Sequence, residues 1–401
     1  MPTLLQINVT ANWGSTGKIA EQIGVLAQQH SWESYLAYGR DMNPSKNKLV
    51  KIGSMRDVYE HYIENLFLDN EGRASRRSTK KFLKEVESIK PAIVHLHNIH
   101  DHYLNFKLLF EFLNKTDIKV VWTFHDCWPI TGHCMHFITK KCDRWMAGCY
   151  DCPMKKEYPK TLLDRSKQNW DLKKGLFSEN KNLTIVACSD WIAGFVQKSY
   201  LSDKRIEVIH NGCDLKLFAP QIRLQSGKYR IIAVSSLWYP NKGELDIYKL
   251  RSMLPEDEYE IIMVGLSAGQ VNKLPSGIKG IQRTQNVQEL AQLYSDADVL
   301  INPTYEDNFP TVNIEALACG TPVITYRTGG SPEAVDELTG AVVEQGNLDA
   351  LCEKIQEFKI VKFKENHGKD CRFRAEKLFD KDKCFEQYIE LYNRILNSKS
   401  Q

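Results

Sequence analysis

Short apolar segments alternate with helical patterns along this chain, and this alternation restricts its fold more than any other feature. In the first half, apolar segments occupy residues 4–9, 92–96, 119–123 and 183–187. Between most of them, apolar side chains recur three and four residues apart, which is the spacing of a helix that buries one face. Strands that alternate with helices form parallel sheets covered on both faces, so we predict an α/β domain.

The alternation begins again in the second half, at residues 230–235, 260–264, 299–302 and 322–325. Before it, residues 219–228 hold a proline and few apolar side chains, as expected of a linker. We therefore predict an N-terminal domain at 1–218, a C-terminal domain at 219–380, and a last helix at 381–401 that returns to the first domain. Open α/β sheets bind ligands at the carboxyl ends of their strands, so two Rossmann-like domains facing each other across a cleft predict a site in that cleft.

The composition and the apolar runs exclude several classes of protein. The 53 basic and 50 acidic residues leave a formal charge of +3, which is too balanced to indicate a nucleic acid partner. The sequence has no apolar run of about 18 residues, the length of a membrane-spanning helix. Its first residues read as a strand without the basic start of a signal peptide. We therefore expect a cytoplasmic enzyme.

The most informative segment is residues 303–322, which follows an apolar strand. Pro310 suits the first turn of a helix, and Gly320 suits its end. The free N–H groups at the start of such a helix form an anion site suited to a diphosphate. Asp307 precedes the helix, and Glu315 lies in its second turn, where a carboxylate can accept hydrogen bonds from ribose hydroxyls. We expect the loop and the first turn to bind a ligand through Asn308, Phe309, Pro310 and Thr311.

An acid eight residues before Glu315, followed by Glu-Ala-Leu-Ala-Cys-Gly-Thr-Pro-Val at 315–323, resembles the signature of the retaining glycosyltransferases of family 4, also called group 1. The resemblance covers nearly the whole chain. It implies the GT-B fold, a UDP-sugar or GDP-sugar donor and retention of the anomeric configuration. It also implies that Glu315 holds the donor ribose and that Asp307, or Glu306 beside it, contacts the donor sugar. We expect no catalytic metal.

The same family has a basic pair after the first strand of its second domain. Here Lys242-Gly243 matches the lysine half, so the resemblance implies that Lys242 neutralises the leaving diphosphate. The usual arginine is missing, because Ser236 or Trp238 stands near its place. The chain therefore departs from the family pattern at one of its two phosphate-binding charges.

In the first domain, Gly14 and Gly17 lie between a strand and a helix, where glycine lets backbone N–H groups approach a ligand. They resemble the glycine-rich first loop of the family. His125 follows the strand at 119–123, and the resemblance places it against the donor sugar. Asp126 is the expected partner that orients the His125 ring. Four further histidines, at positions 95, 97, 100 and 102, indicate a polar strand end.

Five of the eleven cysteines fall between Cys127 and Cys152. The spacing of Cys149 and Cys152 is typical of a metal knuckle, and Cys134 and Cys142 complete a set of four thiolates for a structural zinc ion. His133 and His136 are alternative ligands. Free or redox-active thiols and another metal cluster are the other interpretations. The insertion at 127–152 resembles one in the subgroup of these transferases linked to colanic acid and capsule assembly.

Six basic residues crowd the helical segment 73–84. A solvated helix face is one interpretation. The other is contact with anionic lipid headgroups or a polyprenyl-diphosphate-linked acceptor at the inner face of the cytoplasmic membrane.

The sequence thus predicts a retaining glycosyltransferase that moves a sugar, from a UDP-sugar more readily than from a GDP-sugar, to a glycan or lipid-linked acceptor. Its products would be exopolysaccharide, capsule or O-antigen. Two alternatives remain. One is a nucleotide-sugar epimerase or hydrolase of the same fold, and the other is a catalytically degenerate carbohydrate-binding protein.

Overall fold

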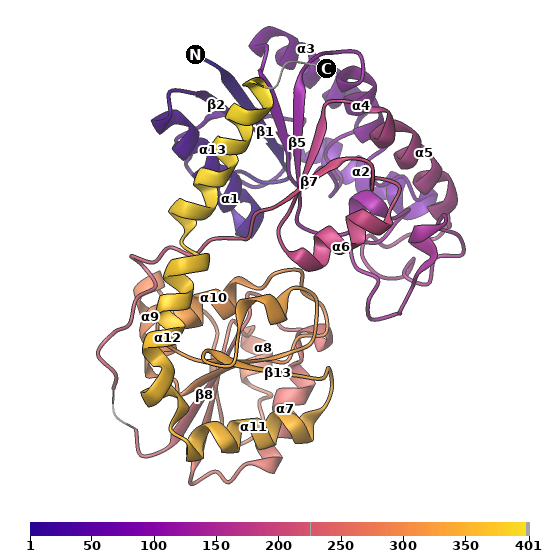
Figure 1. Ribbon diagram of the computed structural model, residues 1–401. Coiled ribbons are helices and arrows are strands. Elements are labelled where there is room, and N and C mark those ends of the chain that lie inside the picture. Colours follow the sequence, from indigo (N-terminus) through magenta and orange to yellow (C-terminus); the bar gives the residue numbers. More distant parts are fainter. Residues whose placement is uncertain (225, 398–401) are drawn as a thin grey trace. The chain divides into compact units, whose positions relative to one another are not determined.

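The computed structural model describes residues 1–224 and 226–397 and divides the chain into two compact units (Figure 1). The first unit contains Met1–Ile209 and the chain from Phe385 on, and the second contains His210–Cys384. Residue 225 of the predicted linker and residues 398–401 of the predicted last helix lie outside the described residues.

The first unit is built on one parallel sheet of seven strands in the order β3-β2-β1-β4-β5-β6-β7. The order reverses between β1 and β4, so the connections after these two strands run to opposite sides and leave room for a ligand at their carboxyl ends. The strands are β1 (Thr3–Asn8), β2 (Glu33–Tyr38), β3 (Lys48–Lys51), β4 (Ile93–Leu96), β5 (Lys119–Phe124), β6 (Leu183–Ala187) and β7 (Arg205–Val208).

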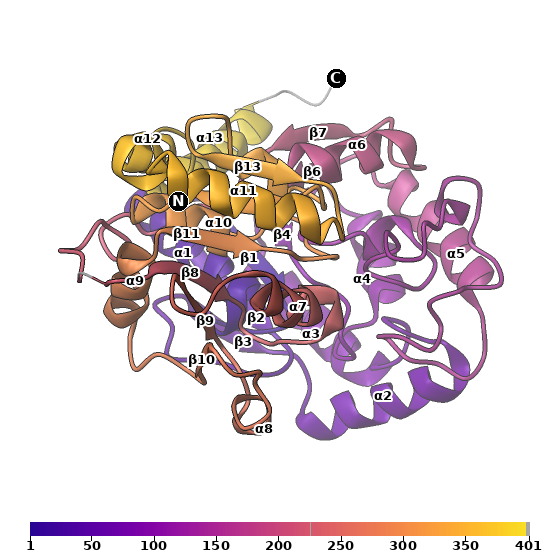
Figure 2. The ribbon, with the colours of Figure 1, turned by 90° about the horizontal axis from the view of Figure 1, so that it is seen from below.

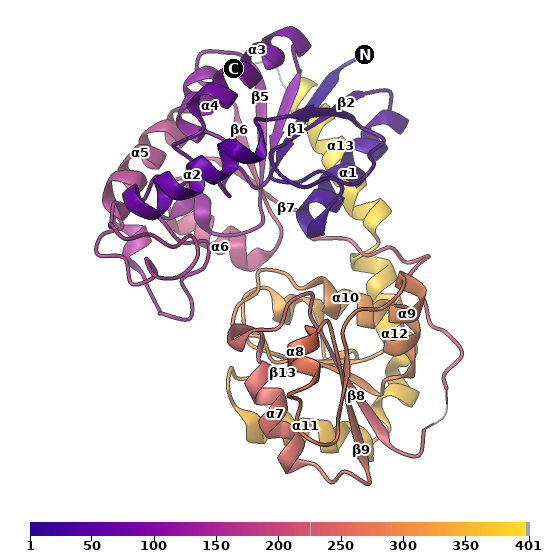
Figure 3. The same ribbon diagram turned by 180° about the vertical axis from the view of Figure 1, so that it is seen from behind.

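Helices cover both faces of this sheet. Figures 1 and 3 show α1 and α13 on one face and α3, α4 and α5 on the other. The segment between β5 and α5 contains only two short 3-10 turns, η1 (Trp128–Ile130) and η2 (Arg144–Met146). The helices are α1 (Gly14–Gln29), α2 (Met55–Leu68), α3 (Arg76–Ile89), α4 (Phe106–Leu113), α5 (Ser166–Glu179), α6 (Asp190–Lys198) and α13 (Lys381–Asn397).

The second unit has a six-stranded parallel sheet in the order β10-β9-β8-β11-β12-β13, with the same reversal between β8 and β11. Figure 2 views these strands from β10 at one edge to β13 at the other. The two parallel sheets confirm the predicted fold class of two Rossmann-like α/β units. The strands are β8 (Tyr229–Val234), β9 (Tyr259–Val264), β10 (Ile278–Ile281), β11 (Val299–Asn302), β12 (Val323–Tyr326) and β13 (Gly340–Val343).

The core of the second unit lies between its sheet and helices α7 and α11. Ile231, Ile261 and Val299 are fully buried there, together with Ile247 of α7 and Ile355 of α11. The opposite face of the sheet carries α9, α10 and α12 (Figure 3). The helices and turns are η3 (Pro240–Lys242), α7 (Glu244–Met253), α8 (Ala268–Val271), α9 (Val287–Asp296), α10 (Thr311–Ala318), η4 (Ser331–Ala334), α11 (Leu348–Ile360) and α12 (Phe363–Leu378).

Among the described residues, no helix combines the length and the apolar character that crossing a bilayer requires.

Buried hydrogen bonds hold the last helix, α13, against the first sheet. Tyr392 Oη lies 2.6 Å from His95 Nδ1, and His95 Nε2 lies 2.8 Å from Thr123 Oγ1. Burial keeps the pKa of His95 well below its usual value, so its ring is neutral and offers one donor and one acceptor. Thr123 Oγ1 donates in turn to Tyr388 Oη at 3.2 Å. The helix is therefore tied to β4 and β5 through polar atoms that water does not reach.

We expect Tyr392→Phe to lower the free energy of unfolding of the first unit by about 1–3 kcal/mol, because it leaves a buried ring nitrogen of His95 without its partner. Urea denaturation followed by tryptophan fluorescence measures this, since the Trp32 ring lies 5.6 Å from that of Tyr392. Tyr59→Phe, at an exposed position of α2, is the matched control. Equal stability of the two variants would contradict the prediction.

Candidate functional site

In the second unit, the loops that follow β8 and β11 meet where the strand order reverses. Lys242, at the end of η3, donates a 2.6 Å hydrogen bond from Nζ to Asp307 Oδ2 and a 3.1 Å bond to the carbonyl of Glu306. Burial alone lowers the pKa of the Lys242 ammonium, but the charge of Asp307 and the hydrogen bond to it raise this pKa above its usual value. Lys242 therefore carries a fixed positive charge at the carboxyl ends of the strands.

Two glycines allow these loops to approach so closely. Gly243 has φ +79°, and a Cβ at this position would lie 2.2 Å from the carbonyl oxygen of Pro303. Gly329, after β12, has φ +55°, and a Cβ there would lie 1.6 Å from the carbonyl oxygen of Asp307. Any other residue at either position would force the backbones apart. The neighbouring amide of Gly330 donates to the carbonyl of Asn308 at 3.0 Å, which fixes the loop from the other side.

Like Asp307, Glu306 contacts the loop that follows β8. Asn241 Nδ2 donates to Glu306 Oε2 at 3.3 Å, while Glu306 Oε1 is buried and accepts no hydrogen bond within the chain. A buried carboxylate oxygen without a donor has lost its water without compensation. The structure therefore brings together three of the predicted residues, Lys242, Glu306 and Asp307, and leaves an acceptor atom available on Glu306.

Helix α10 starts directly after this loop. Pro310 occupies the N-cap position with φ −70°, and no side chain caps the N–H groups of the first turn, which Thr311 begins. Glu315 lies one turn further, where Tyr294 Oη donates to its Oε2 at 3.0 Å. Asn308 and Phe309 are both buried, and the Phe309 ring stacks on His210 with the ring centres 4.8 Å apart. The Phe309 side chain is therefore part of the packing, and its backbone belongs to the loop.

The residues near the expected arginine position have different roles. Ser236 is exposed, whereas Trp238 is buried in the core and donates from Nε1 to the carbonyl of Val264 at 2.8 Å. Neither supplies a charge. Lys242 is thus the basic side chain that the loop after β8 directs at the loop before α10.

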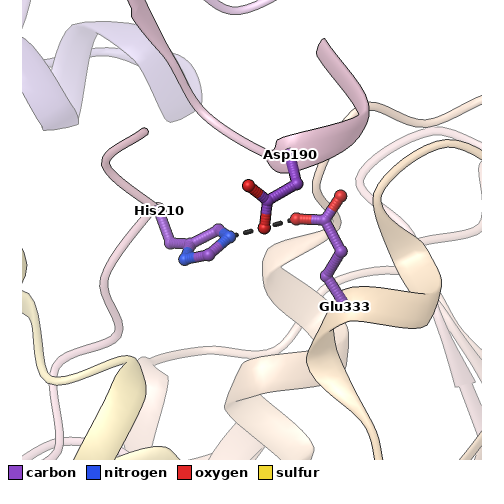
Figure 4. A group of neighbouring side chains, drawn as sticks. All are labelled: Asp190, His210 and Glu333. Carbon is purple, nitrogen blue, oxygen red and sulfur yellow. Dashed lines mark hydrogen bonds and ion pairs between the residues drawn. The ribbon is translucent and has the colours of Figure 1, made fainter. Parts of the chain in front are cut away.

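A hydrogen-bonded pair that was not predicted from the sequence lies in the same unit. His210 Nε2 lies 3.0 Å from Glu333 Oε2, in η4, and Arg374 Nη2 donates to the carbonyl of Glu333 at 3.1 Å. Figure 4 shows this pair; the third side chain drawn, Asp190, belongs to the first unit. The His-Asn-Gly turn at 210–212 was the sequence signal that could have revealed it, since such turns commonly hold a polar side chain at a strand end.

In the first unit, the predicted His125 ends a chain of hydrogen bonds that fixes its tautomer. Gln6 Nε2 donates to the carbonyl of Ala20 at 2.7 Å, so its Oε1 accepts from His97 Nε2 at 3.1 Å. His97 Nδ1 then accepts from His125 Nε2 at 3.0 Å. Burial lowers the pKa of His125 to about 4, more strongly than the nearby Asp126 raises it. His125 is therefore neutral at neutral pH and carries its proton on Nε2.

Asp126 does not orient the ring of His125 as expected. Its Oδ2 lies 2.8 Å from His100 Nε2, and its Oδ1 accepts from the amide of Trp128 at 2.8 Å. Successive residues at a strand end point in different directions, so the sequence neighbour of His125 serves another histidine. His97, from the adjacent strand end, takes the role that was predicted for Asp126.

The two predicted glycines of the first loop have unequal surroundings. Gly14 starts α1 at φ +67°, is exposed, and would meet nothing within 4 Å if it carried a Cβ. A Cβ on Gly17 would lie 2.6 Å from Thr10 Oγ1, so Gly17 is needed to pack α1 against its own loop. Gly14 is consequently the glycine that leaves backbone open to a ligand.

A second polar cluster follows β4. Asp101 and His102 have φ of +81° and +66°, conformations that non-glycine residues seldom adopt. Glu71 stabilises them, since its carboxylate accepts from both backbone amides and lies 2.8 Å from His102 Nε2. Arg40 Nη1 donates to Asp101 Oδ2 at 2.7 Å. Strained backbone held by buried charges is typical of functional strand ends.

The four cysteines that were predicted as metal ligands line one small cavity in the segment between β5 and α5. None of them forms a disulfide. The four residues are Cys134, Cys142, Cys149 and Cys152.

Comparison with known proteins links both units to one family. A sequence model described as Glycosyltransferase Family 4 matches residues 24–217, and one described as Glycosyl transferases group 1 matches residues 228–358. The putative colanic acid biosynthesis glycosyl transferase WcaC of Escherichia coli (strain K12) is 29% identical over 366 residues, which cover 85% of this chain and 87% of WcaC.

Solved structures share the fold over the whole length. Sucrose-phosphate synthase from Thermosynechococcus elongatus superposes with a TM-score of 0.75 at 16% identity, covering 100% of both chains. Anabaena HepE, crystallised in complex with UDP-glucose, gives a TM-score of 0.62 at 14% identity, covering 98% of this chain and 99% of its own.

The charge of His102 should make stability depend on pH. Burial lowers its pKa, but the charge of Glu71 and the hydrogen bonds to Asp101 and Glu71 raise it to about 9. The pair therefore stabilises the fold fully below the unfolded pKa of about 6.5, and this contribution is lost as the pH rises through about 9. We expect the melting temperature to fall by on the order of 5 °C across this range in the native chain.

His102→Gln should reduce that slope while lowering the melting temperature at pH 6.5. His30→Gln, at an exposed histidine, is the control and should leave the slope unchanged. Identical slopes for the native chain and His102→Gln, in thermal scans from pH 6.5 to 9.5, would exclude the charged state of His102.

Proposed function

The chain belongs to the glycosyltransferases of group 1 and family 4, and we propose that it transfers a sugar from a nucleotide-sugar donor to a glycan or lipid-linked acceptor. The observation that carries this proposal is the position of Lys242, 2.6 Å from Asp307 at the strand reversal of the second unit. That arrangement supplies positive charge at the carboxyl ends of the strands, where open α/β sheets bind ligands.

Lys242 and the start of α10 would bind the donor diphosphate together. The uncapped N–H groups of the first turn attract an anion, and the lysine adds a full charge at the other side of the same loop. As the diphosphate leaves the sugar it gains negative charge, so these groups stabilise the transition state more than the ground state. Asp307 must release Lys242, at least in part, when the donor binds. We expect no catalytic metal, since Lys242 and the start of α10 supply the positive charge.

Glu315 is suited to the ribose of the donor. Its carboxylate is oriented by Tyr294, and it lies one turn behind the proposed diphosphate site. Asn308, Phe309, Pro310 and Thr311 would contribute backbone contacts along the nucleotide. The solved structure of HepE holds UDP-glucose, which supports UDP over GDP as the nucleotide of the donor.

His125 would lie against the donor sugar as a neutral group. Retention of configuration proceeds through a transition state with positive charge on the sugar ring, and a cation at this position would oppose it. Its low pKa, caused by burial, keeps the imidazole uncharged. Asp307 or Glu306 would hold the sugar hydroxyls, and the leaving phosphate would accept the proton of the acceptor, so positioning and charge carry the reaction.

We propose that the enzyme binds the membrane that carries its lipid-linked acceptor. It would do so through what we call the α2–α3 surface. It combines exposed aromatic side chains on α2 with exposed basic side chains on α3, namely Tyr59, Tyr62, Phe67, Arg76, Arg77 and Lys80. The two helices adjoin, because Arg76 pairs with Glu64 at 3.7 Å. Aromatic side chains enter the headgroup region and basic ones attract anionic lipids. WcaC is named for colanic acid biosynthesis, which supports a role in polysaccharide assembly.

We expect Lys242→Ala to reduce kcat/KM for sugar transfer by about 100-fold or more, because one charge on the leaving group is lost. Glu315→Gln should mainly raise the KM for the donor. Release of UDP from a panel of UDP- and GDP-sugars, with and without a lipid-diphosphate acceptor, measures both. Lys279→Ala, at an exposed position of β10, is the matched control.

If the native chain neither binds nor turns over any nucleotide-sugar in that panel, the proposal fails and the carbohydrate-binding alternative gains support. Turnover that releases only free sugar, whatever acceptor is offered, would favour the hydrolase.

Reversing the charge at Arg76, Arg77 and Lys80 should weaken binding to vesicles containing anionic phosphatidylglycerol by at least about 10-fold, since each basic group near such a surface contributes about 1 kcal/mol. Co-sedimentation measures this. Reversal at Lys228, Lys249 and Lys279 of the second unit is the matched control. Replacing Tyr62 and Phe67 by serine tests the apolar part separately. Unchanged binding of the α3 variant would assign these charges to an ordinary solvated face.

A further inference from the structure

The segment between β5 and α5 has little regular secondary structure. Beyond η1 and η2, the described residues 125–165 contain no helix or strand. Loops of this length inside a compact domain are uncommon unless a further interaction stabilises them. One contribution is aromatic, since the rings of Phe137 and Trp145 stack with centres 5.2 Å apart. The rest of the segment surrounds the cavity that the four cysteines line.

The thiols at this cavity already have the contacts that thiolate ligands use. The side chains of Cys134 and Cys152 are hydrogen bonded to each other. The amide of Gly132 donates to Cys149 Sγ at 3.2 Å, and the amide of Met154 donates to the Cys152 side chain. Backbone N–H groups directed at sulfur stabilise the ionised form. At two of the four cysteines a backbone N–H group is thus directed at the side chain, as it is at the sulfur of a metal-bound thiolate.

A histidine beside the thiols lines the same cavity and has one unused ring nitrogen. The His133 side chain is 1% exposed, and its Nδ1 lies 2.7 Å from Asp69 Oδ1. Its Nε2 is buried and has no hydrogen-bond partner within the chain. A buried ring nitrogen without a partner costs stability, so this cavity is expected to hold a further group.

A buried lysine lies beside the same cysteines. Lys173, on α5, is 1% exposed and donates from Nζ to the carbonyls of Trp128 at 2.8 Å and Thr131 at 3.0 Å. The acidic groups that act electrostatically on Lys173 are Cys149, Cys134, Glu71 and Asp126.

We propose that Cys134, Cys142, Cys149 and Cys152 bind one structural zinc ion, with His133 and Lys173 as positioning residues around it. Zinc displaces the four thiol protons, and four thiolates leave the site with a net charge of −2. His133 lines the same cavity with its ring oriented by Asp69, and the Lys173 side chain lies near Cys149 and Cys134. Four protein ligands close the tetrahedron, so the ion holds the segment together and takes no part in sugar transfer.

Binding requires a local rearrangement. No three of these donor atoms lie within 4.8 Å of one another. In a zinc site with Zn–S bonds of about 2.3 Å, the sulfur atoms approach more closely than that. The ligands come from a segment without helices or strands, so the required shifts disturb no backbone ladder.

The first experiment is metal analysis of the full chain, purified without chelators under reducing conditions. We expect about one zinc per chain. Cys134→Ser, Cys142→Ser, Cys149→Ser and Cys152→Ser should each lose most of it. Cys352→Ser, at a buried thiol of α11, is the matched control and should keep it. His133→Gln should retain the stoichiometry at saturating zinc but bind about 10- to 100-fold more weakly.

A second measurement uses the native chain, so it does not depend on whether the variants fold. Replacing the metal of the native chain by Co²⁺ should produce the absorption bands of tetrahedral thiolate coordination, and a strong chelator should lower the melting temperature. Absence of zinc together with a disulfide between Cys134 and Cys152 in mass spectra would overturn the proposal. So would full zinc content in Cys142→Ser combined with its loss in His133→Gln. These readouts are independent of glycosyl transfer, so they stand or fall apart from the proposed function.

Discussion

The second unit depends on the contact between two loops that leave neighbouring strands in opposite directions. Because the strand order reverses between β8 and β11, the loop carrying Lys242 and the loop carrying Asp307 are the two that meet. Gly243 and Gly329 remove the side chains that would keep the backbones apart. The ion pair is therefore a consequence of topology and of two small residues, and the start of α10 is positioned by the same loop.

Burial acts in opposite ways on two histidines of the first sheet. His125 donates to another imidazole, that of His97, and burial lowers its pKa to about 4. His102 faces the carboxylate of Glu71, and its pKa rises to about 9. Both follow parallel strands of the same sheet. One strand edge can thus hold a neutral ring beside a proposed sugar site and a charged ring that stabilises strained backbone, because the partner decides which form is favoured.

The sequence predicted the features that depend on local pattern. Alternation revealed both sheets, and a motif placed Lys242 and Asp307 in one site although 65 residues separate them. It did not predict which neighbour each side chain meets. Asp126 was paired with His125 because they adjoin in sequence, whereas the geometry of the strand end directs it to His100. Gly17 and Phe309 likewise serve packing against Thr10 and His210, and such contacts depend on tertiary structure that no periodicity encodes.

The cysteine segment and the strand end that carries His125 are physically coupled. Asp126 accepts a hydrogen bond from the amide of Trp128, and the Lys173 ammonium binds the carbonyl of Trp128 and lies 3.3 Å from the centre of its ring. The single turn η1 therefore joins the His100–Asp126 pair on one side to the cavity lined by cysteines on the other. Any interaction that orders the cysteine segment also restrains η1, and with it the residue next to His125. A structural cross-link in the cysteine segment would therefore fix the end of β5 without contacting the donor or the acceptor.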